Sequence, residues 1–107
     1  MPLTLEQLLE RQKAWSEHTF GPGDRTKGVC AHLRKEIDEA EADPRAAGEW
    51  ADIIILAMDG AWRCGITGAQ LAEAVKAKQD KNARRLWPDW RTASPDAPIE
   101  HVRGHED

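Results

Sequence analysis

The sequence predicts an all-α fold, and three observations support this class. Apolar residues recur at helical spacing along most of the chain, as in the series Val29, Leu33 and Ile37. Capping boxes of the form Thr-x-x-Gln begin at Thr4 and Thr67. Helix-breaking signals at Gly21-Pro22-Gly23, Asp43-Pro44 and Gly65 separate these segments. We therefore expect a four-to-five-helix bundle.

The expected helices follow from these start and stop signals. The first follows Thr4, and a loop at 18–27 contains the sequence Gly-Pro-Gly. Asp43 is a good N-cap residue and Pro44 is favoured at the first helical position, so we expect the third helix to begin at Pro44. Gly65 is placed as a left-handed C-cap. The expected helical ranges are 5–16, 25–42, 44–64 and 67–86.

Length and composition restrict the class of protein. A chain of 107 residues is expected to form a single domain (1–107), with an extended tail from about residue 89. The formal charge of −4 and the lack of an extended basic patch argue against nucleic-acid binding. Neither a secretory signal nor a transmembrane stretch is expected, and Cys30 and Cys64 lack metal-ligand spacing. We expect a cytoplasmic protein that does not bind membranes.

The run Ile53–Met58 is apolar on every side of a helix. Its three isoleucines also suit a β-strand, but the length of the segment and its Asp-Pro start favour a helix. A helix that is buried all round in so small a domain implies that a second subunit covers part of it. This pattern predicts a homo-oligomer, with the third helix near the interface.

Two acidic pairs of equal spacing flank the Asp43-Pro44 connection. They are Glu36-x-x-Glu39 and Glu49-x-x-Asp52, and residues three apart lie on one face of a helix. A connection this short makes the two helices antiparallel neighbours, so four carboxylates are expected to converge. Such charges repel unless a divalent cation is bound, and oxygen ligands suit Mg²⁺ or Mn²⁺. The alternative is a pair of solvated helix faces.

The acidic pairs and several other motifs resemble the all-α, MazG-like nucleoside triphosphate pyrophosphohydrolases, above all the branch of dATP/dGTP diphosphohydrolases. The motifs are FGPGDR (20–25), HLRKEI (32–37), EWADI (49–53), KxxxNxxRxWP (78–88) and PIEHVR (98–103). The resemblance implies hydrolysis of dGTP or dATP, or of both, to the monophosphate and pyrophosphate. It also implies a phage-type enzyme, which would then act in the host cytoplasm.

The resemblance implies roles for particular residues. Glu36, Glu39, Glu49 and Asp52 would hold two or three Mg²⁺ or Mn²⁺ ions, with Glu39 and Glu36 as the catalytic acids. A water would attack the α-phosphorus, and Glu39 would orient or deprotonate that water. The expected phosphate-binding residues are Lys35, Lys78, Asn82 and Arg85, and the expected nucleoside contacts are Trp15, Phe20, His32 and Asp59.

Each of these side chains also has a structural interpretation. Trp15 suits core packing, His32 suits a solvent-facing position, and Asp59 suits an ion pair with Arg63. Lys and Arg near a helix C-terminus complement the helix dipole. Two other functions stay open: hydrolysis of a pyrimidine or non-canonical triphosphate, and a non-catalytic helical interaction module. The resemblance predicts a homodimer or homotetramer.

Overall fold

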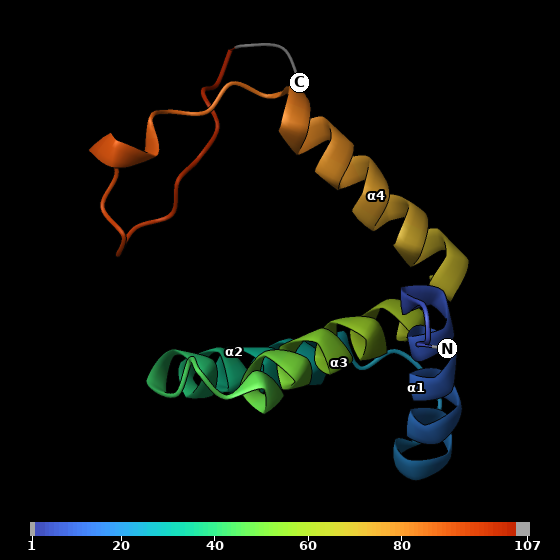
Figure 1. The fold of residues 1–107 in the computed structure, drawn as a ribbon. Helices are drawn as coiled ribbons and strands as arrows, with labels where there is room; N and C mark the ends of the chain where they lie inside the picture. The colour runs from blue at the N-terminus through green and yellow to red at the C-terminus, as the bar shows by residue number, and fades with distance from the viewer. Residues whose placement is uncertain (1, 105–107) are drawn as a thin grey trace. The chain divides into compact units, whose positions relative to one another are not determined.

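The computed structural model describes residues 2–104 and is all-α in this range, as predicted (Figure 1). No β-strand is present within it. The elements are α1 (Leu5–Phe20), α2 (Thr26–Ala42), α3 (Ala47–Arg63), α4 (Gly68–Arg84) and a 3₁₀-helix, η1 (Trp90–Thr92). No helix in residues 2–104 is both long enough and apolar enough to cross a membrane.

The chain forms two compact units, of which the first ends at Ala72 and the second begins at Glu73. In the first unit α2 and α3 run antiparallel and side by side, and α1 packs against the C-terminal part of α3 (Figure 1). The core between α1 and α3 consists of Leu9, Met58 and Trp62. That the whole chain acts as one domain stays a prediction.

The first helix is longer than predicted. Thr4 and Gln7 form the expected capping box, but α1 continues to Phe20 because no helix breaker occurs before Gly21. Gly21 ends it with a φ of 86°, a value that suits glycine. The loop predicted at 18–27 is therefore confined to residues 21–25, and Asp24 Oδ1 accepts a hydrogen bond of 2.8 Å from the Thr26 amide.

The prediction that α3 begins at Pro44 was wrong. The Asp43 amide still donates to the Glu39 carbonyl of α2, and the Asp43 carbonyl accepts from the Ala46 amide at 3.2 Å. Residues 43–46 therefore form a turn, and α3 begins at Ala47 without a side-chain N-cap. The indole of Trp50 donates to the Pro44 carbonyl at 2.9 Å and fixes this turn to α3.

The connection from α3 to α4 follows the prediction at both ends. Gly65 has the left-handed φ of 86°, and the Ile66 amide donates to the Ala61 carbonyl. Thr67 and Gln70 form the second capping box. The start of α4 lies against α1, since the Gly68 amide donates to Glu10 Oε2 at 2.8 Å.

The apolar run of α3 is not buried on all sides within one chain. Met58 is buried, but Ile54 and Ile55 are 53% and 39% exposed. Within the single chain α1 and α2 together cover only part of this helix. That a second subunit covers the rest stays a prediction.

The second unit holds the rest of α4 and the C-terminal segment. The Trp87 indole donates to the Asn82 carbonyl at 2.8 Å, and the Val102 amide donates to the Leu86 carbonyl at 2.8 Å. The rings of Trp87 and His101 are 5.9 Å apart. The tail predicted as extended from residue 89 contains η1, which Asp89 caps.

Candidate active site

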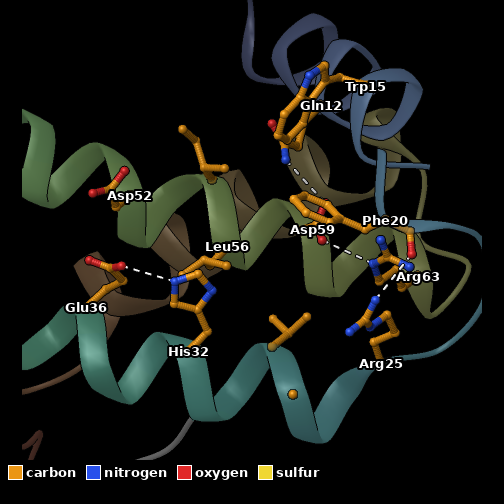
Figure 2. A pocket seen from close by; sticks show the side chains of 13 residues that line it. Gln12, Trp15, Phe20, Arg25, His32, Glu36, Asp52, Leu56, Asp59 and Arg63 are labelled. Carbon is orange, nitrogen blue, oxygen red and sulfur yellow. Dashed lines mark hydrogen bonds and ion pairs between the residues drawn. The ribbon is translucent and has the colours of Figure 1, made fainter. Parts of the chain in front are cut away.

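Three acidic side chains meet between α2 and α3. Glu36, Glu49 and Asp52 each place a carboxylate oxygen within 4.8 Å of the others. Figure 2 shows Glu36 and Asp52 on neighbouring helices at one end of a pocket. Glu39 lies next to Glu36, whose hydrogen bond and charge raise the pKa of the Glu39 carboxyl. The sequence predicted that four carboxylates converge; three form the cluster and the fourth adjoins it.

Glu49 has the most unusual surroundings of the four. Its Oε2 atom is buried and has no hydrogen-bond partner. Burial raises the pKa of the Glu49 carboxyl, and the charges of Glu39, Asp52 and Asp43 raise it further. A buried oxygen without a donor, surrounded by other acids, suits a hard cation, because Mg²⁺ and Mn²⁺ take oxygen ligands. The donor set of this cluster therefore fits the predicted metal.

His32 adjoins the acidic cluster from one turn earlier on α2. Its Nε2 atom is 3.1 Å from Glu36 Oε1, so the ring lies within hydrogen-bond distance of a cluster carboxylate. The imidazole is half exposed, and it lines the same pocket as Glu36 and Asp52. A histidine in this place orients the carboxylate beside it.

The pocket has a volume of about 410 Å³, within the usual range for small-molecule sites. The acids lie at one end, and Trp15 and Phe20 lie toward the other (Figure 2). The two aromatic rings are 5.4 Å apart in an edge-to-face arrangement, and both are more than half exposed. Trp15 therefore does not belong to the core, which leaves its ring face available to a ligand.

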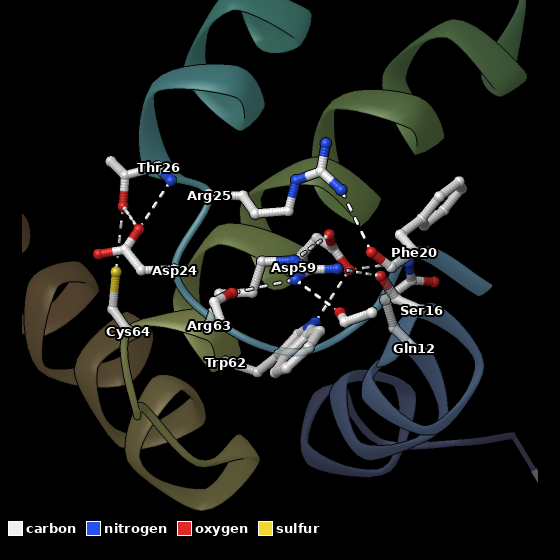
Figure 3. Close-up of polar contacts among 12 residues, drawn as sticks. Gln12, Ser16, Phe20, Asp24, Arg25, Thr26, Asp59, Trp62, Arg63 and Cys64 are labelled. Atoms are coloured by element: carbon white, nitrogen blue, oxygen red, sulfur yellow. Dashed lines mark hydrogen bonds and ion pairs between the residues drawn. The ribbon is translucent and has the colours of Figure 1, made fainter. Parts of the chain in front are cut away.

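Asp59 and Arg63, which both line this pocket, form a buried ion pair (Figure 3). Arg63 Nε donates to Asp59 Oδ2 at 3.1 Å, and its other nitrogens donate to the Gly21 and Gly23 carbonyls and to Ser16 Oγ. One guanidinium thus joins α1, the 21–25 loop and α3. The ion pair suggested by the sequence is present, and Asp59 also lines the pocket.

The residues predicted to bind phosphate lie on two elements. Lys35 is exposed on α2, where its charge counteracts the raised pKa of the Glu39 carboxyl. Lys78, Asn82 and Arg85 belong to the second unit, where Arg85 Nη1 donates to Asn82 Oδ1 at 2.9 Å. Their role toward phosphate stays a prediction.

The site residues predicted from the sequence do not include Gln12. Gln12 lies in the pocket and donates to Asp59 Oδ1 at 3.3 Å. The available signal was its position, since it is a polar residue at helical spacing from Leu5, Leu9 and Trp15. Arg25, which follows the Gly-Pro-Gly loop, also lines the pocket and donates to the Phe20 carbonyl at 3.2 Å.

A solved structure resembles this chain over almost its whole length. It is the cyanophage S-2L MazG-like pyrophosphohydrolase bound to dGDP and three catalytic Mn²⁺ ions per active site. The match has a TM-score of 0.77 and 31% identity, and it covers 98% of both chains. The fold and the acidic helix pair together define an all-α, MazG-like pyrophosphohydrolase.

Sequence comparisons give the family. The dATP/dGTP diphosphohydrolase of cyanophage S-2L is 38% identical over 89 residues, which are 81% of each chain. That of Salmonella phage PMBT28 is 37% identical over 86 residues, but the match spans only 28% of the longer protein. Residues 8–106 match the dATP/dGTP pyrophosphohydrolase family, and the chain belongs to this family. The protein is therefore an enzyme, and the alternative hypothesis of a non-catalytic interaction module is rejected.

Proposed function

We propose that this enzyme hydrolyses dGTP and dATP to the monophosphate and pyrophosphate with Mg²⁺ or Mn²⁺. The acidic cluster with its unpaired Glu49 oxygen, at one end of a nucleotide-sized pocket, is the observation that carries this proposal. The names of the relatives support the purine deoxynucleotide, and the dGDP and Mn²⁺ of the solved neighbour support the ligand and the metal.

The acids have separate roles in this mechanism. Glu36, Glu49 and Asp52 would hold the ions together with Glu39, and His32 lies within hydrogen-bond distance of Glu36 and would orient it. Two or three bound ions supply positive charge against the triphosphate and lower the pKa of the attacking water. Glu39 adjoins the cluster as an exposed carboxylate beside Glu36, so it is open to a water bound there. Glu39, assisted by Glu36, therefore orients and deprotonates the water that attacks the α-phosphorus.

The remaining predicted contacts bind the substrate. Trp15 and Phe20 present exposed aromatic surface to the base, and His32 and Asp59 line the nucleoside part of the pocket. The phosphate groups interact with basic and amide side chains, which offset their charge in the transition state. These are Lys35, Lys78, Asn82 and Arg85.

The active form is a homodimer or a homotetramer. Trp50 and Ile54, one turn apart on α3, are 51% and 53% exposed, and a second copy would cover them. The phage origin of the relatives supports action in the cytoplasm of an infected cell.

A triphosphate panel tests the function. Purified enzyme is assayed for pyrophosphate release from the four deoxynucleoside triphosphates, with Mg²⁺, with Mn²⁺ and with EDTA. We expect metal-dependent turnover of dGTP and dATP. Glu39→Gln and Asp52→Asn should each lower kcat by about 10²-fold or more, because each removes a carboxylate from the reaction centre.

Asp38→Asn is the matched control. Asp38 is exposed on α2, and its substitution converts a carboxylate to an amide outside the acidic cluster. Circular dichroism should be unchanged in all three variants. Unchanged turnover in Glu39→Gln or Asp52→Asn would reject the assignment of the acids. Turnover of pyrimidine triphosphates alone would reject the purine substrate.

A further inference from the structure

Gln12 of α1 and Asp59 of α3 both line the pocket, and their side chains point toward one another (Figures 2 and 3). Asp59 is 7% exposed. Burial alone would raise the pKa of its carboxyl, but hydrogen bonds from Ser16, Trp62, Arg63 and Gln12 together lower it. Asp59 is therefore an ionised carboxylate, which accepts hydrogen bonds and cannot donate one.

The ionised carboxylate fixes the orientation of the Gln12 amide. Only the NH₂ group of Gln12 can face Asp59, and Nε2 donates to Asp59 Oδ1 at 3.3 Å. The carbonyl oxygen of Gln12 is consequently turned away from Asp59, on a side chain that lines the pocket. An amide that is held in this way offers a hydrogen-bond acceptor at a fixed position.

The neighbours of Gln12 indicate what such an acceptor would meet. Trp15 lies one turn along α1 and forms the aromatic pair with Phe20, whereas the acidic cluster lies at the other end of the pocket. With the phosphates at the acids, a base at the aromatic end of the pocket would pack on the exposed face of Trp15 or Phe20, with its edge toward Gln12. Stacking on aromatic rings is common to all bases, so the polar edge contact determines which base is preferred.

We propose that Gln12 is a specificity-determining residue, whose carbonyl oxygen accepts a hydrogen bond from the exocyclic amino group of the purine base. Asp59 is its positioning residue, and Arg63 holds Asp59 in place. This inference rests on the proposed function, because it takes a purine nucleotide as the ligand. It adds a means of base recognition that the acids and the aromatic pair do not provide.

Two matched nucleotide pairs test this proposal. dGTP and dITP differ only in the 2-amino group, and dATP and deoxynebularine triphosphate differ only in the 6-amino group. In at least one pair, the wild-type enzyme should prefer the amino-bearing member by about tenfold in kcat/KM. Gln12→Leu should reduce this ratio of kcat/KM values to near one. For the member without the amino group, kcat/KM of the variant should stay within about threefold of the wild-type value. Leucine is of similar size, and Asp59 keeps its bonds to Trp62 and Arg63.

Asp59→Asn gives a second, independent readout. An asparagine can donate to Gln12 and so releases the amide from its fixed orientation. The amino-group preference should fall toward one, whereas a general loss of folded enzyme would lower kcat/KM for both members of a pair equally and leave the preference unchanged. Lys13→Leu, an exposed change one residue along α1, is the control and should keep the wild-type preference.

Calorimetry with α,β-imido analogues of the same pairs separates this proposal from the proposed function. Loss of the amino-group preference in Gln12→Leu binding supports the role of Gln12 whether or not turnover occurs. A wild-type enzyme that binds the pairs with this preference but releases no pyrophosphate would reject the proposed function alone. Equal wild-type binding within both pairs, or a preference that persists in Gln12→Leu, would overturn the assignment of Gln12.

Discussion

Glu49 illustrates what a residue type and its spacing can and cannot predict. Its i, i+3 spacing to Asp52, and the matching pair on the previous helix, were sufficient to predict that carboxylates meet. The buried Oε2 atom without a partner was not predictable, because burial of one oxygen depends on how closely two helices pack. Gln12 was missed for a related reason: its significance comes from Asp59, which is 47 positions away in the sequence.

Neutralising Glu49 should have opposite effects with and without metal. In EDTA, Glu49→Gln should raise the unfolding midpoint by a few degrees, since it removes repulsion among the acids. Mn²⁺ should stabilise the wild-type protein by mass action and stabilise the variant much less. Thermal unfolding with EDTA and with a Mn²⁺ titration measures both effects.

Glu41→Gln, at an exposed position on α2, is the control and should respond to Mn²⁺ as the wild type does. A variant that is less stable than the wild type in EDTA, or that keeps the full Mn²⁺ shift, would contradict a metal role for Glu49.

At the scale of the elements, the four helices were predictable and their ends were less so. Capping boxes at Thr4 and Thr67 placed two starts correctly, because both partners of each box are local in sequence. Asp43-Pro44 was misleading, because the Asp43 amide remains bonded to α2 and the next helix starts only after a turn. Local motifs do not reveal which of two neighbouring helices a connecting residue will join.

The junction of α1 with the start of α4 makes a testable prediction. A Cβ atom on Gly68 would lie 2.5 Å from the Glu6 carbonyl oxygen, a backbone atom that cannot move aside. Gly68→Ala should therefore destabilise the protein by about 1–3 kcal/mol, as overpacked positions do. Urea unfolding followed by circular dichroism measures the change.

Gly48→Ala is the matched control for this substitution, since a Cβ there meets nothing within 4 Å and the residue is helical. It should be neutral or stabilising by up to about 1 kcal/mol, given the helix propensity of alanine. Equal stability of the two variants would show that α1 and α4 do not meet at Gly68.

At the scale of the whole molecule, the apolar run of α3 favours an assembly, because one chain leaves part of the run exposed. The all-round hydrophobicity of Ile53–Met58 predicted that a second subunit covers part of this helix, and the single chain leaves Ile54 and Ile55 exposed. Hydrophobicity in a sequence indicates that a surface is buried, but it does not indicate whether the same chain or a second subunit covers that surface. The number of subunits accordingly stays a prediction.

Substitution at this surface tests the assembly. Ile54→Glu should convert the wild-type oligomer to monomer at micromolar concentration, because it places a charge in an apolar interface. A rise of roughly thirtyfold or more in the dissociation constant is expected, as measured by light scattering over a dilution series.

Leu3→Glu is the control, since Leu3 is 45% exposed near the N-terminus, and it should leave the assembly intact. A wild-type protein that is itself monomeric at micromolar concentration would contradict the proposed oligomer.

The turn at residues 43–46 bears on the order in which the enzyme folds. Glu36 and Asp52 are only 16 positions apart, and the Trp50–Pro44 hydrogen bond secures the link between their helices. Closing so short a loop costs little chain entropy, and contacts between near neighbours form fast. We therefore expect the acids that are proposed to bind the cations to meet early in folding, and the aromatic half of the pocket to form later, when α1 packs against α3.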